Sequence, residues 1–60
     1  MPYINVKLAG SLSREQKQEI AREITDTMQR IAHKPPSYTY IVFDEVEMED
    51  WAIAGQLLDE

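Results

Sequence analysis

Two strand-like segments stand on either side of one helical segment, and this order constrains the fold more than any other feature. Residues 3–8 alternate apolar and polar side chains with a period of two, which predicts a strand with one face on a core. Residues 38–43 carry β-branched and aromatic side chains in both alternating sets, which predicts a strand covered on both faces. A strand, a helix of about twenty residues and a second strand form a right-handed crossover between parallel strands. The sequence therefore predicts an α+β fold with a β-α-β protomer.

The intervening helix has a start signal, an apolar stripe and a stop signal. Ser13 and Gln16 fit a capping box, so the helix is expected to begin near Arg14. Its apolar residues recur at helical spacing along one side: Ile20, Ile24, Met28 and Ile31. Lys34 is followed by two prolines, which cannot continue a helix and push the preceding residue out of the helical region.

The chain is short and needs stabilisation from outside its own core. We expect residues 1–60 to form one domain, and a chain of this length buries only about 60% of the surface that its unfolded form exposes. It has no cysteine and one histidine, so neither disulfides nor a thiolate or histidine-rich metal site is expected, and no cofactor is implied. Two strands alone are too small a sheet. We therefore expect subunits to pair into larger sheets as a homo-oligomer.

The charge distribution narrows the classes of partner. The net charge of −5 argues against nucleic acid, which requires a clustered basic face. Every lysine and arginine lies at or before Lys34, whereas residues 44–50 contain acids and no base, so that an anionic ligand would be held from the N-terminal half. The acidic run is most simply interpreted as a solvated loop. Without a signal-peptide pattern or a membrane-length apolar stretch, a cytoplasmic protein with no membrane contact is expected.

Pro2 directly precedes the first strand and has two interpretations. If Met1 is removed, Pro2 becomes a rigid secondary amine held inside folded structure, which is a natural general base. The structural alternative is that proline is tolerated at the first residue of a strand, because its missing N–H need not join a ladder. Taken alone, Pro2 favours the structural interpretation.

Together with the element Trp51–Gly55 after the acidic run, these features resemble the 4-oxalocrotonate tautomerase family over essentially the whole chain. The resemblance implies homodimers or homohexamers with active sites between subunits. It also implies that Pro2, freed of Met1, moves a proton between the oxygen and the carbon of an enol to give a keto acid, without a cofactor. Burial in an apolar pocket lowers the pKa of an amine. A positioned base with a pKa near the working pH contributes about 10²–10⁴-fold to a rate.

The chain departs from the family at the two arginines that bind the dicarboxylate substrate of the enzyme that names it. Leu12 and Tyr40 stand at those places and carry no charge, so a bidentate carboxylate contact is missing. We therefore expect a small enol or 2-oxo acid with at most one carboxylate. Arg14 or Lys7 would be the substitute, although an arginine at a helix start is more often a solvated surface residue.

The resemblance further implies which residues line the pocket. Trp51 matches the family's active-site aromatic and would lower the local dielectric, but it serves equally well as an interface anchor. The Tyr40 hydroxyl would donate to an enolate oxygen, or Tyr40 would pack against the next subunit. Tyr38 is expected on the same face, as an interface residue. Leu12 and Ala9 would complete the lining.

Three further positions are interpreted as structural. Ala52 and Ala54 replace glycines that usually follow the family's aromatic, and they would be strained if those positions need a positive φ. His33 near the helix C-terminus suits the macrodipole better than it suits catalysis.

Three functions follow from these residues. The first is a cofactor-free tautomerase or isomerase that uses Pro2. The second is a catalytically inactive oligomeric binding module on the same scaffold, because fold does not determine function. The third is hydratase or decarboxylase chemistry on the same amine.

Overall fold

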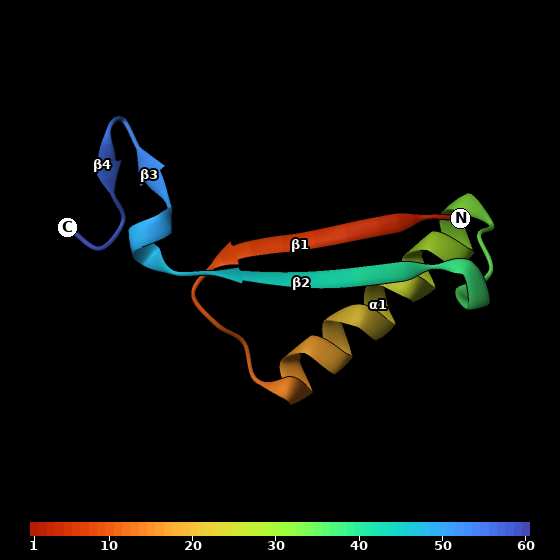
Figure 1. The fold of residues 1–60 in the computed structure, drawn as a ribbon. Helices are drawn as coiled ribbons and strands as arrows, with labels where there is room; N and C mark the ends of the chain where they lie inside the picture. Colours follow the sequence, from red (N-terminus) through yellow and green to blue (C-terminus); the bar gives the residue numbers. More distant parts are fainter.

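The computed structural model describes residues 1–60 and has the predicted β-α-β order (Figure 1). A parallel two-stranded sheet is followed by a small C-terminal hairpin. The elements are β1 (Tyr3–Ala9), α1 (Arg14–Ala32), the 3-10 helix η1 (Pro36–Tyr38), β2 (Tyr40–Val46), the 3-10 helix η2 (Met48–Asp50), β3 (Ala52–Ile53) and β4 (Gln56–Leu57).

Helix α1 covers one face of the sheet (Figure 1). The strands are in parallel register, with Tyr3 opposite Tyr40 and Ala9 opposite Val46. The apolar set on the helix side is half-buried: Ile4, Val6, Leu8, Ile41 and Phe43. The helix contributes a half-buried stripe that confirms most of the predicted one: Ile20, Ala21, Ile24 and Met28. Ile31, predicted on the stripe, is 66% exposed in the protomer.

Both ends of α1 are closed by local hydrogen bonds. The capping box is confirmed, because the Gln16 N–H donates to Ser13 Oγ (3.1 Å) and the Ser13 N–H donates to Gln16 Oε1 (2.9 Å). At the other end His33 adopts the left-handed conformation (φ 59°), and its N–H donates to the Gln29 carbonyl at 3.1 Å. His33 therefore has a structural role as the residue that ends the helix.

The second strand begins and ends later than predicted. The Tyr38 N–H donates to the Pro35 carbonyl at 3.1 Å, so Tyr38 lies in η1 and not on the strand face of Tyr40. The first free donor is the Tyr40 N–H, which bonds the Pro2 carbonyl at 3.0 Å. The prediction of a solvated loop over residues 44–50 was wrong for 44–46, which extend β2. Two acids of this extension form ion pairs with lysines: Lys7 Nζ lies 3.3 Å from Asp44 Oδ2, and Lys17 Nζ lies 3.1 Å from Glu45 Oε1.

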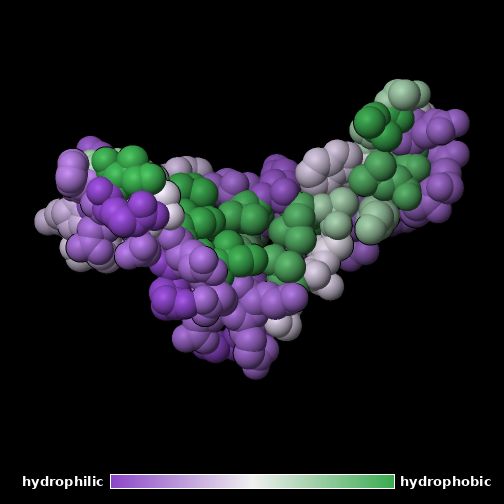
Figure 2. Space-filling model, turned by 180° about the vertical axis from the view of Figure 1, so that it is seen from behind, coloured by the Kyte–Doolittle hydropathy of each residue, from purple (hydrophilic) through white to green (hydrophobic).

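The sheet face away from α1 has no cover in the protomer. This outer face consists of Tyr3, Asn5, Lys7, Tyr40, Val42 and Asp44. No residue of the protomer is fully buried, and its accessible surface is 4780 Å², whereas a compact monomer of this mass exposes about 4,000 Å². The radius of gyration is 14.4 Å, against about 10 Å for a compact domain of this length. Figure 2 shows an apolar band running along the molecule toward the hairpin end. The protomer is thus an elongated unit with apolar surface exposed to solvent.

The C-terminal hairpin extends beyond the end of the sheet (Figure 1). Ala52 pairs with Leu57 and Ile53 with Gln56. The two residues between the strands, Ala54 (φ 53°) and Gly55 (φ 81°), both have positive φ, as a tight hairpin turn of type I′ requires. The expected strain therefore falls on Ala54, while Ala52 is an ordinary strand residue.

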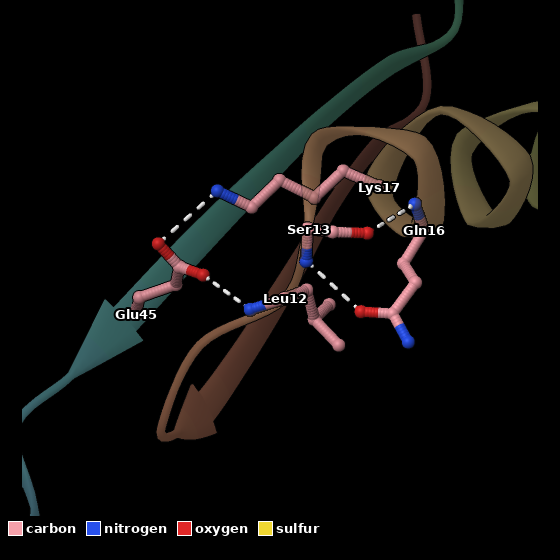
Figure 3. Close-up of polar contacts among 5 residues, drawn as sticks. All are labelled: Leu12, Ser13, Gln16, Lys17 and Glu45. Atoms are coloured by element: carbon pink, nitrogen blue, oxygen red, sulfur yellow. Dashed lines mark hydrogen bonds and ion pairs between the residues drawn. The ribbon is translucent and has the colours of Figure 1, made fainter.

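The loop between β1 and α1 (residues 10–13, the β1–α1 loop) is held to β2 by Glu45 (Figure 3). Its carboxylate accepts the Leu12 N–H at 2.7 Å and pairs with Lys17 at 3.1 Å. The hydrogen bond from the Leu12 backbone, followed by the bond and charge of Lys17, lowers the pKa of the Glu45 carboxyl below its ordinary value of 4.5.

Relief of the strained turn predicts a gain in stability. Ala54→Gly removes a Cβ from a left-handed position and should raise the free energy of unfolding by about 0.5–1 kcal/mol. Ala52→Gly is the matched control, since glycine inside a strand should lower it by a similar amount. Urea unfolding at one fixed protein concentration measures both, and a loss of stability in Ala54→Gly would contradict the strain.

The Glu45 contacts predict a pH-dependent stability difference between wild type and Glu45→Gln. Because the folded-state pKa is depressed, the ionised carboxylate stabilises the fold fully above the unfolded-state pKa. That contribution is lost as the pH falls through the folded-state value, so the difference should shrink below pH 4.5. Urea unfolding of both proteins across the acidic range tests this, and a difference independent of pH would oppose it.

Candidate active site

The residues expected to form the site lie in two groups at opposite ends of the sheet. Pro2 and Tyr40 lie where the strands begin. The other group lies where the strands end: Ala9, Leu12, Arg14 and Trp51. The seven residues of β1 separate the groups by about 23 Å, at a rise of about 3.3 Å per residue. One protomer therefore does not bring the two groups together.

At the proline end, the backbone fixes Pro2 against the second strand. Pro2 is half-buried, and its carbonyl accepts the Tyr40 N–H at 3.0 Å. Tyr40 is 54% exposed on the outer face, next to Tyr3, whose phenol oxygen accepts a hydrogen bond from the Asn5 side-chain amide at 3.2 Å. Pro2 thus neighbours two tyrosines: Tyr3 follows it in the chain, and Tyr40 lies opposite Tyr3 on β2. The sequence interpretation missed Tyr3, although its place opposite Tyr40 follows once the parallel register is known.

At the carboxyl end, the loops converge on the last residues of the strands. Gly10 donates its N–H to the Val46 carbonyl at 3.1 Å, and half-buried Leu12 donates to Glu45. Trp51 is also half-buried, at the base of the hairpin, where its carbonyl accepts the Leu58 N–H at 2.9 Å. A pocket opens here, lined by Gly10, Ser11, Glu45, Val46, Glu47 and Met48.

Ion pairs determine which cations are free to bind an anion. Four of the six have a carboxylate partner: Lys7 with Asp44, Lys17 with Glu45, Arg22 with Glu19, and Arg30 with Asp26. Arg14 has none, and its guanidinium contacts only the Gln18 side chain, at 3.4 Å. It lies at the edge of an open depression lined by Arg14, Lys17, Gln18, Ala21 and Phe43. Of the two proposed substitutes for the missing arginines, Lys7 is committed to Asp44, which leaves Arg14.

The polar residues of the protein do not form a metal-binding cluster. No group of three or more histidine, cysteine, aspartate or glutamate side chains is placed to hold a metal ion. No helix of the structure, α1 included, is both long enough and apolar enough to cross a membrane. What the two ends of the sheet offer is an imino acid, phenol hydroxyls, an indole and one free guanidinium, which suits proton transfer on a small anion.

Known sequences and structures resemble this chain along its whole length. The probable tautomerase of Ralstonia nicotianae is 35% identical over 60 residues, covering 100% of this chain and 92% of that protein. DmpI from Helicobacter pylori superposes with a TM-score of 0.88 at 26% identity, covering 97% of this chain and 91% of that one. A 4-oxalocrotonate tautomerase homologue superposes with a TM-score of 0.90 at 27% identity, covering 100% and 95%.

A heterohexameric 4-oxalocrotonate tautomerase from Chloroflexus aurantiacus shares the fold, with a TM-score of 0.87 at 23% identity and coverage of 100% and 97%. The family model described as "Tautomerase enzyme" matches residues 2–60. With the β-α-β fold and a match over nearly every residue, this chain belongs to the tautomerase family, in the group typified by 4-oxalocrotonate tautomerase.

Proposed function

We propose that the protein is a cofactor-independent tautomerase that interconverts the enol and keto forms of a small 2-oxo acid, with Pro2 as the base and acid. The observation that supports this most directly is the placement of Pro2. It starts a strand of a tautomerase fold, and the Tyr40 N–H holds its carbonyl at 3.0 Å.

Removal of Met1 is a chemical requirement of this proposal. With Met1 attached, the Pro2 nitrogen is an amide nitrogen and has no basicity. Met1 is 85% exposed, whereas Pro2 is half-buried. After removal, the secondary amine lies directly before the start of β1, and the bond from the Tyr40 N–H to the Pro2 carbonyl holds this residue against β2.

The proposed reaction is one proton moving between two atoms of the substrate. The Pro2 amine takes the proton from the enol hydroxyl while the electron pair of the O–H bond forms the carbonyl. The carbon end of the former double bond then takes a proton back from the Pro2 ammonium. Atoms and charge balance without an oxidant, a metal or another reactant. A phenol, such as that of Tyr40, would stabilise the oxyanion that develops between these steps.

The separation of the two groups implies a site shared between subunits. Both strands of the two-stranded sheet are edge strands with free backbone donors and acceptors. If a second copy pairs with an edge about a two-fold axis, its strands run antiparallel to the first. The Pro2 end of one subunit then lies beside the Leu12 and Trp51 end of the other. A homodimer is the smallest assembly with such a site, and a homohexamer built of dimers contains it as well.

Arg14 is the residue that would bind the substrate carboxylate. It is the free cation at the carboxyl end, and a lone guanidinium suits a substrate with one carboxylate. Ala9, Leu12 and Trp51 of the same end would enclose the remainder of the substrate in apolar surface.

The first prediction of the proposed function concerns Pro2. Pro2→Ala should abolish nearly all ketonisation of phenylenolpyruvate while leaving the oligomer intact, because the rigid secondary amine is lost and the strand is not. Intact mass, size-exclusion chromatography and an absorbance assay on the same preparations measure this.

Two results would count against the tautomerase. A chain processed to begin at Pro2 that turns over neither phenylenolpyruvate nor 2-hydroxymuconate would favour the inactive binding module. An active wild type with an equally active Pro2→Ala would place the chemistry elsewhere.

The second prediction concerns Arg14 and the shared site. Arg14→Gln should raise KM for phenylenolpyruvate about tenfold, because the carboxylate loses its charged partner. Mixed Pro2→Ala and Arg14→Gln subunits should recover activity beyond the sum of the separate proteins, since in a hybrid dimer both changes fall in one site and the other is native.

Arg22→Gln is the matched control, because Arg22 lies on the exposed side of α1 and is paired with Glu19. It should leave KM unchanged. If the mixture showed only the sum of the two separate activities after subunit exchange, the site would lie within one protomer.

A further inference from the structure

We propose that Glu45 is a positioning residue of the tautomerase site: by accepting the Leu12 N–H, it fixes the β1–α1 loop against β2 and so sets where Leu12 and Arg14 meet the substrate. This inference rests on the proposed function, because Leu12 and Arg14 belong to the proposed site. Glu45 itself does not touch the substrate.

The contact joins parts of the chain that are distant in sequence. Glu45 lies near the end of β2, and its carboxylate reaches across to the Leu12 N–H at 2.7 Å (Figure 3). Its other oxygen pairs with Lys17, in the first turns of α1, at 3.1 Å. One side chain therefore ties the strand, the loop and the helix start to one another.

The Leu12 bond is the stronger candidate for control of the loop. A carboxylate that accepts a backbone N–H forms a short, charge-assisted hydrogen bond, and 2.7 Å is at the short end of the range for such bonds. The lowered pKa of the Glu45 carboxyl has this bond as its largest cause. The Lys17 pair is about one third exposed on each side and is screened by solvent.

The residues on either side of Leu12 are held by other hydrogen bonds, so the position of Leu12 depends on its bond to Glu45. Gly10 on one side is bonded to the Val46 carbonyl, and Ser13 on the other is held by the Gln16 side chain of the capping box. Leu12 lies between them, and its only N–H bond goes to Glu45. Loss of that bond would free the Leu12 side chain and the start of α1, where Arg14 lies. The Gly10 and Ser13 hydrogen bonds on either side would remain.

Three variants separate the two contacts of Glu45. Glu45→Ala removes both, and it should raise KM for phenylenolpyruvate about tenfold with little change in kcat, since substrate binding is weakened and Pro2 is untouched. Glu45→Gln keeps an oxygen that accepts the Leu12 N–H, and Lys17→Met removes only the ion pair. Both should stay within about threefold of the wild-type KM.

Asp26→Ala is the control for loss of an ion-paired acid, because Asp26 pairs with Arg30 on the exposed side of α1. Asp26→Ala should change neither KM nor kcat. All assays are made on full-length protein well below the unfolding transition, with the oligomeric state checked for each variant.

Amide hydrogen exchange gives a readout that does not depend on turnover. The Leu12 amide should exchange slowly in wild type and in Lys17→Met, and much faster in Glu45→Ala. A Leu12 amide that exchanges freely in wild type would overturn the proposal. So would a Glu45→Ala enzyme that has lost stability but keeps the wild-type KM.

The failure of this inference is distinct from failure of the proposed function. An inert wild type contradicts the tautomerase activity, and the Leu12 exchange rate then still decides whether Glu45 fixes the loop. An active wild type with a KM that is insensitive to Glu45→Ala contradicts the positioning role alone.

Discussion

The structure depends on one constraint, which is that a single helix can cover only one face of a two-stranded sheet. The half-buried residues on the helix side, such as Val6 and Phe43, have a packing partner, and those on the outer face, such as Tyr3 and Val42, do not. Neither strand edge is paired with a further strand. The elongated shape follows directly, because the sheet and the hairpin arm do not fold back on a common core. Apolar surface of this kind is costly to leave in water, at about 25 cal/mol per Å².

The same constraint determines the geometry of the site. A parallel strand pair places both chain starts at one end and both chain exits at the other, so Pro2 and Trp51 are separated by the length of the sheet. In the proposed function Pro2 is the base and the Leu12 and Trp51 end binds the substrate, and one protomer carries these two groups at opposite ends. In the proposed shared site, assembly would serve catalysis as well as stability, since pairing of two subunits would bring the Pro2 end of one to the Leu12 and Trp51 end of the other.

Charge pairing explains how the chain tolerates acids in its second strand. Asp44 points to the outer face and meets Lys7, whereas Glu45 points to the helix side and meets Lys17 and the Leu12 N–H. These pairings give both lysines a carboxylate partner. Arg14 is left as the free cation at that end, which fits a substrate with a single carboxylate and is consistent with uncharged residues at positions 12 and 40.

Local patterns in the sequence were enough for the element order and the helix start at Arg14, and the resemblance of the whole chain was enough for membership in the tautomerase family. The element order and the helix start depend on short-range physics: a capping box spans four residues, and the period of an apolar pattern is read within one segment. The start of β2 and the role of Glu45 depended on the tertiary structure. Whether Tyr38 joins the ladder is decided by the turn bond to Pro35, and whether Glu45 is a solvated acid or a loop contact is decided by the approach of Leu12, 33 positions away. The separation of Pro2 from Leu12 likewise appears only when the strands are placed side by side, because distance across a sheet is set by register and not by sequence spacing.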